Sequence, residues 1–222
     1  MSDGFETMVA RSRTFLAELA QNNDRVWFDA HKQAFKTEIE GPAKLLTELF
    51  AEDLSRLTGA AHEGKMGRIY RDVRFSKDKS PYNTYLHCYW RGGGHPAQGW
   101  LLNIRADGVE LMTGLHALDP DGVRQYRAAV HRDGDALVKA MEPAENGGAD
   151  LMSFGDDILK RAPKPYDPDH PHADLLKRKQ IIMGRRLTEA DTADGLIAAM
   201  TATARSLVPF WRWCSKAMRP GA

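Results

Sequence analysis

Apolar residues in the first part of the chain recur every three or four positions, a spacing that places them on one side of a helix. The pattern predicts one helix from Thr7 to Ala20 and a second that begins after Asp24, whose side chain can cap the first turn. A third helix is predicted from Ala43 to Leu57. We expect Gly41-Pro42 to break the chain between the last two helices and restart it, because proline suits a first helical turn.

From Gly67 onward apolar residues alternate with polar ones, which is the period of a strand with one buried face. Asp107-Gly108 is typical of a tight hairpin turn, which needs positive φ, and the three glycines at 92–94 mark a loop. The alternation predicts a four-stranded antiparallel meander, with strands at residues 68–75, 85–91, 100–105 and 109–113.

The remainder of the chain mixes helical and extended patterns. Asp119-Pro120 marks the start of a helix, and a second helical piece is predicted from Asp133 to Met141. The other predicted elements are short helices at 154–159 and 171–179, a fifth strand at 180–187, and a long amphipathic helix at 192–218 that Pro209 should kink.

Strands that cluster between helical ends indicate an α+β fold, not a regular alternation of strands and helices. We predict an antiparallel-dominated sheet of about five strands, packed by N-terminal and C-terminal helices. No domain boundary is visible, so we expect a single domain over residues 1–222. It would contain a helical part at about 5–58, the sheet meander at about 67–115, and helices with one further strand at about 119–218.

Composition narrows the class of protein. Hydrophobic residues at 42% and charged residues at 27% are typical of a soluble globular chain. The two cysteines, Cys88 and Cys214, have no disulfide or zinc spacing, and neither a secretory signal nor a membrane span is recognisable, so we expect a reduced, cytoplasmic protein. A net charge of +1 argues against a surface that coats nucleic acid broadly, so any preference for anions must be local.

The local charge lies between Lys65 and Lys79, where six basic residues stand against Asp72 and Asp78. If residues 68–75 form a strand, Arg71 shares its face with three apolar residues. An unpaired guanidinium is too costly to leave in a dry core. Arg71 should therefore form a buried ion pair, extend its charged end to water, or face a ligand at the rim of a pocket.

The loop at residues 76–83 adds lysines, hydroxyl groups and turn amides to these arginines, and together they suit a phosphate or carboxylate group. Most turns of this composition are simply solvated, and no glycine-rich phosphate loop is present. The predicted ligand-binding residues are Arg68, Arg71, Arg74, Lys77, Lys79 and Tyr82.

Residues for catalysis are few. His87 and Asp72 are the candidates for a general acid or base, although a histidine within a strand is more often simply packed. No Gly-x-Ser-x-Gly elbow occurs. His170 and His172 form the one local histidine cluster, and because Pro171 between them favours a helix start over a metal geometry, we expect no metal and no cofactor.

Two stretches of this sequence are distinctive. Residues 22–28, with the sequence Asn-Asn-Asp-Arg-Val-Trp-Phe, precede a long central motif at residues 68–82, and Asp167-Pro168-Asp169-His170-Pro171 follows nearer the C-terminus. This combination resembles a conserved family known as domain of unknown function 2461, over roughly Phe15 to Trp213. The resemblance implies no particular reaction.

Two functions are consistent with these residues. The first is a pocket beside the sheet for a small anionic molecule, with the arginines binding charge and Tyr82 and His87 donating or accepting hydrogen bonds. The second is a binding module for single-stranded nucleic acid or a protein partner, which would use the basic strand and the aromatic residues around it. A pocket requires these side chains to converge on a concavity, whereas a module would spread them over an open face.

Overall fold

The computed structural model describes residues 3–219, and at its centre is an antiparallel sheet with the strand order β1-β2-β3-β4-β6-β5. The α+β prediction is confirmed, with six strands in this part of the chain where about five were expected. The strands are β1 Glu63–Met66, β2 Tyr85–Arg91, β3 Gln98–Arg105, β4 Gly108–Leu115, β5 Asp150–Leu151 and β6 Ile181–Leu187.

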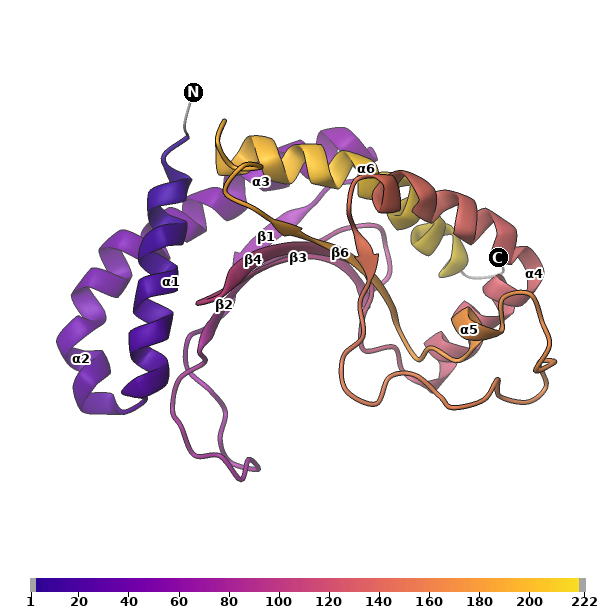
Figure 1. Ribbon diagram of the computed structural model, residues 1–222, viewed down its shortest axis with the longest axis horizontal. Helices are drawn as coiled ribbons and strands as arrows, with labels where there is room; N and C mark the ends of the chain where they lie inside the picture. The colour runs from indigo at the N-terminus through magenta and orange to yellow at the C-terminus, as the bar shows by residue number, and fades with distance from the viewer. Residues whose placement is uncertain (1–2, 220–222) are drawn as a thin grey trace.

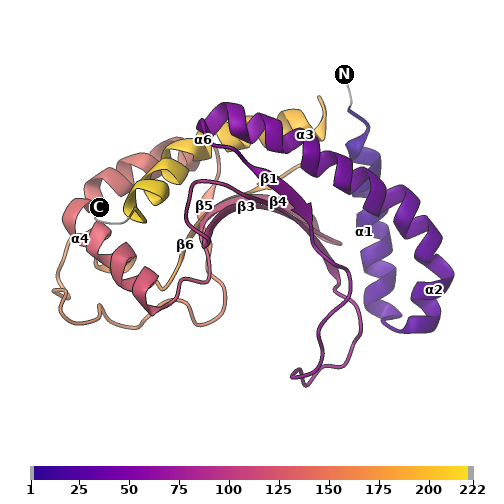
Figure 2. The same ribbon diagram turned by 180° about the vertical axis from the view of Figure 1, so that it is seen from behind.

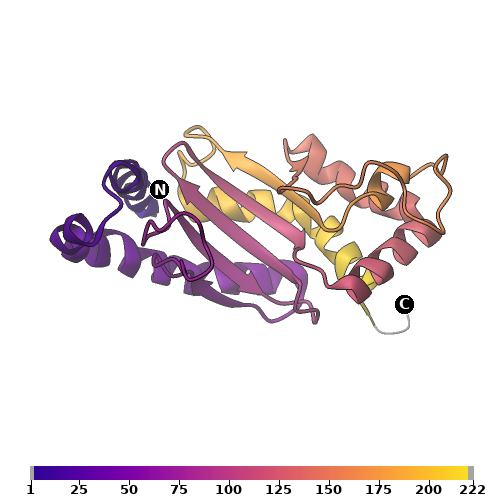
Figure 3. The same cartoon turned by 90° about the horizontal axis from the view of Figure 1, so that it is seen from below.

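Helices cover one face of this curved sheet (Figure 1). They are α1 Phe5–Gln21, α2 Arg25–Ala34, the π-helical segment η1 Phe35–Glu40, α3 Gly41–Thr58, α4 Pro120–Asn146, α5 Ala173–Leu176 and α6 Leu196–Ala217. In Figure 1, and from behind in Figure 2, α3 and α6 cross the convex side of the sheet. The pair α1 and α2 descends at one end of the arch, and α4 with α5 at the other. Seen from below, none of the helices within residues 3–219 crosses the concave face (Figure 3).

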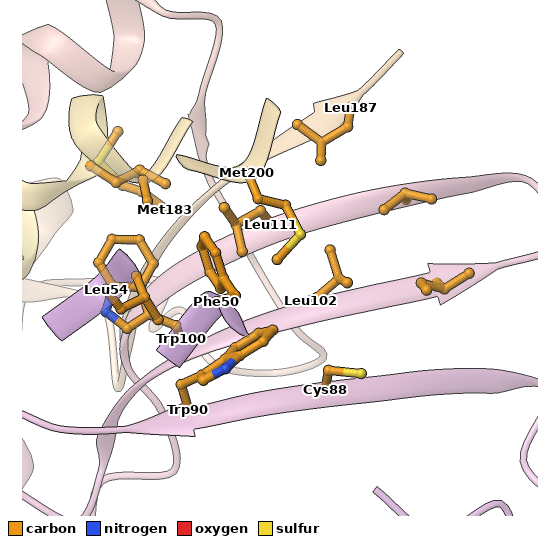
Figure 4. Close-up of a cluster of buried hydrophobic side chains, with 14 of the residues drawn as sticks. Phe50, Leu54, Cys88, Trp90, Trp100, Leu102, Leu111, Met183, Leu187 and Met200 are labelled. Atoms are coloured by element: carbon orange, nitrogen blue, oxygen red, sulfur yellow. The ribbon is translucent and has the colours of Figure 1, made fainter. Parts of the chain in front are cut away.

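The core lies between the convex face and the two crossing helices. Alternation along β2 sends Leu86, Cys88 and Trp90 into it, while Tyr85, His87 and Tyr89 point to the other face. Figure 4 shows Trp90 beside Phe50 of α3, and their rings meet edge to face at a centroid distance of 5.0 Å. The split between the two faces leaves the polar residues of β2 on the concave side. No helix in the described part of the chain is long and apolar enough to cross a membrane.

The predicted break at Gly41-Pro42 is wrong, because α2, η1 and α3 follow one another without a gap. Gly41 donates its N–H to the carbonyl of Lys36, five residues back, and this wide π turn accommodates the proline that follows. By contrast, the two helical pieces predicted after Pro120 are both present: α4 is kinked at Asp133, where φ is −151° and ψ is 54°, and this residue separates its two helical parts.

Two other predicted elements are wrong. Residues 68–75 do not form a strand, and only Tyr70 bridges to Tyr82, with Arg71 N donating to Pro81 O and Asn83 N to Ile69 O. Pro81 has no N–H to continue this ladder, and residues 72–79 bond to one another within the loop. The helix predicted at 154–159 is an irregular segment, because the Asp157 side chain ties down the Phe154 N–H.

Candidate functional site

The concave face of the sheet holds a cavity of about 740 Å³. Strand register places three pairs of residues on its floor, one residue of each pair from β2 and the other from β3. The pairs are Tyr85 with Arg105, His87 with Asn103, and Tyr89 with Leu101, and all six residues line the cavity. The floor therefore consists of alternate residues of two central strands, which share one face of the sheet.

Three segments that lie far apart in the sequence complete the walls. The β2–β3 loop contributes His95, the connection from β4 to α4 contributes His116 and Asp119, and the irregular segment after β5 contributes Phe154. His116 and Phe154 meet edge to face at a ring distance of 6.5 Å. The cavity is thus built from loops that meet at one end of the strands.

Aromatic rings follow one another along the β2 side of the floor. The rings of Tyr85 and His87 are stacked, with centroids 4.3 Å apart and planes inclined by 29°. Tyr89 is next on the same face, and the guanidinium of Arg91 lies 5.9 Å from its ring centroid. These half-buried rings form a continuous aromatic row along one side of the floor, in which Tyr85 and His87 stack on each other.

His87 is uncharged at neutral pH. Burial lowers the pKa of its imidazole to about 4, and the positive charge of Arg105 and the ring of His116 add to this effect, while Asn103 opposes it. A general base works best when its pKa lies near the working pH. This value therefore favours a neutral hydrogen-bonding partner for His87 over the acid–base role predicted as one possibility.

Asn103 is a buried polar residue with an unused acceptor. Its side chain is 3% exposed, its Nδ2 donates to the Glu110 carboxylate at 3.4 Å, and its Oδ1 has no hydrogen-bond partner. Native structures rarely leave a buried acceptor unpaired, so such a group needs an explanation. The neighbouring donor is His87, the β2 partner of Asn103, because a hydrogen bond with the Asn103 side chain raises the pKa of the His87 imidazole.

The charged residues that line the cavity are Arg91 and Arg105 against a single carboxylate, Asp119. With the nearby histidine His87 neutral, arginine side chains dominate the electrostatics of the floor. Guanidinium groups bind carboxylates and phosphates through two parallel hydrogen bonds. The cavity therefore combines a row of aromatic side chains with fixed positive charge.

The residues predicted to bind an anion lie instead on the loop between β1 and β2. Arg71 pairs with Asp78 and donates to Ser80 O at 3.2 Å, and Lys79 donates to Val73 O at 3.0 Å. Arg74 forms a two-pronged pair with Asp72, the other predicted acid–base residue, and this pair lowers the pKa of Asp72. These contacts fold the loop upon itself.

The other three predicted residues differ in burial. Tyr82 is buried and stacks on Phe28 of α2 at a ring distance of 4.1 Å, while Arg68 and Lys77 are exposed. None of the six predicted ligand residues lines the cavity, whereas His87 does. The sequence does carry a signal for the cavity. Polar residues stand at alternate positions of β2 and β3, and this alternation puts Arg91, Asn103 and Arg105 on the same face of the sheet as His87.

Arg71 does not lie in a dry core, because its side chain is 25% exposed and Phe75, assigned to the same buried face, is 97% exposed. Since Asp78 is itself 60% exposed, Arg71→Ala should lower the free energy of unfolding by well under the roughly 3–5 kcal/mol lost from a broken buried pair. Urea unfolding monitored by circular dichroism measures this change. The matched control is Arg74→Ala, which breaks the exposed ion pair between Arg74 and Asp72. A loss for Arg71→Ala that reaches the buried-pair range would contradict this description of the loop.

His170 and His172 lie near a third histidine. The ring of His131 is 5.0 Å from that of His170, and His172 Nε2 is 2.9 Å from the Asp135 carboxylate. Across residues 3–219 no group of three or more histidine, cysteine or acidic side chains is arranged to hold a metal ion. Burial raises the pKa of the Cys88 thiol to about 12, so it is not a nucleophile at neutral pH.

Comparison with known proteins identifies the sequence at the level of a family. The family described as "Conserved hypothetical protein (DUF2461)" matches residues 11–213 of the 222-residue chain. A search of curated proteins finds no match.

Proposed function

Since the chain belongs to the DUF2461 family of conserved hypothetical proteins, we propose its function from its own geometry: it binds a small anionic molecule on the concave face of the sheet. The observation that carries this proposal is the cavity of about 740 Å³ whose charged lining is two arginines and one aspartate. Pockets for small molecules usually measure about 300–1,000 Å³. They combine apolar and aromatic walls with a few polar groups, as this one does.

Arg105 is the residue that we assign to the anionic group. It ends β3, opposite Tyr85 at the start of β2, and it lines the cavity with an exposed side chain. Its charge also helps to lower the pKa of His87, which supports a position close to the floor. Arg91, at the far end of β2, is the second cation of the lining.

The basic loop contributes to this proposal through its charge. It leads directly into Tyr85, and Figures 1 and 3 show it projecting on the concave side of the sheet. The exposed cations Arg68 and Lys77 raise the positive potential at that end of the cavity. We therefore assign them the steering of an anion and assign Arg71, Arg74 and Lys79 the folding of the loop.

A thermal-shift screen of anionic metabolites, followed by calorimetry of the hits, tests the proposal. A ligand that prefers the folded state raises the melting temperature. We expect at least one anion to stabilise the wild type and to lose about tenfold or more in affinity with Arg105→Gln. Arg74→Gln, which changes an arginine outside the cavity, is the matched control and should bind normally. Failure of every anion, or equal binding by Arg105→Gln, would contradict the assignment.

One observation favours a second function. The aromatic row of Tyr85, His87 and Tyr89 lies on a sheet face that no helix crosses, and such rows stack the bases of single-stranded nucleic acid. Oligonucleotide affinity that falls steeply with salt would support this function. Absence of oligonucleotide binding at low salt would rule it out.

A further inference from the structure

The two arginines of the cavity lie at opposite ends of its floor. Arg91 ends β2 opposite Gly99, and Arg105 ends β3 opposite Tyr85. We propose that the cavity binds an elongated molecule with two anionic groups, one held by Arg105 and the other by Arg91, and with an apolar spacer between them. This inference rests on the proposed function, because it describes the molecule that occupies the same cavity. It adds a second anionic group, which the proposed function does not require.

Both guanidinium groups have their N–H donors available to a ligand. Within residues 3–219 neither group forms a hydrogen bond or a salt bridge with another residue, and both side chains are exposed. The one carboxylate of the lining, Asp119, instead accepts the Gly122 N–H at 2.7 Å, where α4 begins. The protein itself therefore leaves the positive charge at each end of the floor without a counter-charge. An anionic group at each end supplies one.

The positions of the two side chains set the distance between the anionic groups. Arg91 Cζ lies 5.9 Å from the ring centroid of Tyr89, so this side chain turns toward the middle of the floor. The charge of Arg105 lowers the pKa of His87, which lies one pair further in than Tyr85 and Arg105. Successive pairs on one face are about 7 Å apart, so the backbones of the two arginines are about 20 Å apart. With both side chains directed inward, the bound anionic groups would be about 7–14 Å apart, one or two such steps.

The floor between the two arginines has an apolar middle. Tyr89 of β2 pairs with Leu101 of β3, and Leu101 pairs with Met112 of β4. All three residues line the cavity, where they form one row across the sheet. Covering this row with hydrocarbon is favourable, whereas a polar spacer would lose its hydrogen bonds to water. The spacer that fits between the two anionic groups is therefore apolar.

Suberate and its monomethyl ester separate the second charge from the chain, because the ester keeps the carbon chain and masks one carboxylate. We expect wild type to bind suberate about tenfold more tightly by calorimetry, the difference that one hydrogen-bonded charge makes. In Arg91→Gln the ratio should fall to about one. Arg205→Gln, which removes an exposed arginine of α6 outside this cavity, is the matched control and should keep the wild-type ratio. Hexane-1,6-diyl bisphosphate and its monophosphate repeat the comparison with phosphate groups.

The outcomes separate this inference from the proposed function. If neither bis-anion binds wild type more tightly than its partner with one anionic group, the second group is ruled out, and binding lost with Arg105→Gln would still support a site for one anion. A preference that Arg91→Gln leaves unchanged would also overturn the inference, because another residue would hold the second group. If no probe binds wild type, the inference is wrong, whatever other anions the screen finds. If Arg91→Gln does not fold, the comparison of the probes on wild type decides the question alone.

Discussion

Replacing Trp90 with alanine is expected to lower the free energy of unfolding by about 3–5 kcal/mol, a large part of the stability of a typical domain. The indole is fully buried, packs edge to face on Phe50, and donates its N–H to Thr47 O of α3 at 2.8 Å. It reaches α3 across β1, where Gly64 leaves room, since a Cβ there would lie 2.6 Å from the indole nitrogen. Alanine would leave a void at the junction of helix and sheet and would remove the hydrogen bond from the indole to α3.

Urea unfolding followed by far-ultraviolet circular dichroism measures this loss without relying on tryptophan fluorescence. Trp27→Ala is the matched control, because Trp27 is only half buried and stacks on His31 near the surface. We expect the control to lose clearly less stability than Trp90→Ala. Similar losses in the two variants would show that Trp90 does not hold the sheet to α3.

Much of the fold could be predicted because its elements follow simple periods. The Tyr85–Arg91 pattern identified β2, and Asp107-Gly108 placed the β3–β4 hairpin to within one residue. The turn consists of Ala106 and Asp107, Gly108 already belongs to β4, and neither Asp107 nor Gly108 has the expected positive φ. The alternation of polar and apolar residues gave a wrong prediction at residues 68–75. These residues belong to a loop whose charged side chains pair with one another. A strand needs a partner with both backbone donors and acceptors, and Pro81 on the opposing segment offers its carbonyl to Arg71 but has no N–H to donate.

The candidate site was predicted only in part, for a related reason. His87 could be singled out because it lies between two tyrosines on one strand. Arg105 and Asn103 join it only through the register of β2 with β3, and His116 and Phe154 only through the tertiary packing of distant loops. The concentration of basic residues in the sequence indicated the loop between β1 and β2 as the site. The cavity instead depends on a few charged residues that only the fold brings together.

The stability of the protein should fall as the pH is lowered from 6.5 to 4, and His87 should account for about 3 kcal/mol of that loss. Above pH 6.5 the imidazole of His87 is neutral in both the folded and the unfolded chain, so its full contribution to the free energy of unfolding is present. Below pH 6.5 the unfolded chain gains a proton that the folded chain, with its pKa of about 4, does not accept. The lowered pKa values of Asp72 and Asp78 affect stability only below about pH 4, where the unfolded carboxylates become protonated.

Urea unfolding of wild type and His87→Gln across this range isolates the contribution of the residue. His62, whose pKa is also lowered by burial, keeps part of the pH dependence in the variant, so the slope should decrease and not vanish. If His87→Gln keeps the full slope, the pKa of His87 is the same in the folded and unfolded states, and burial does not lower it.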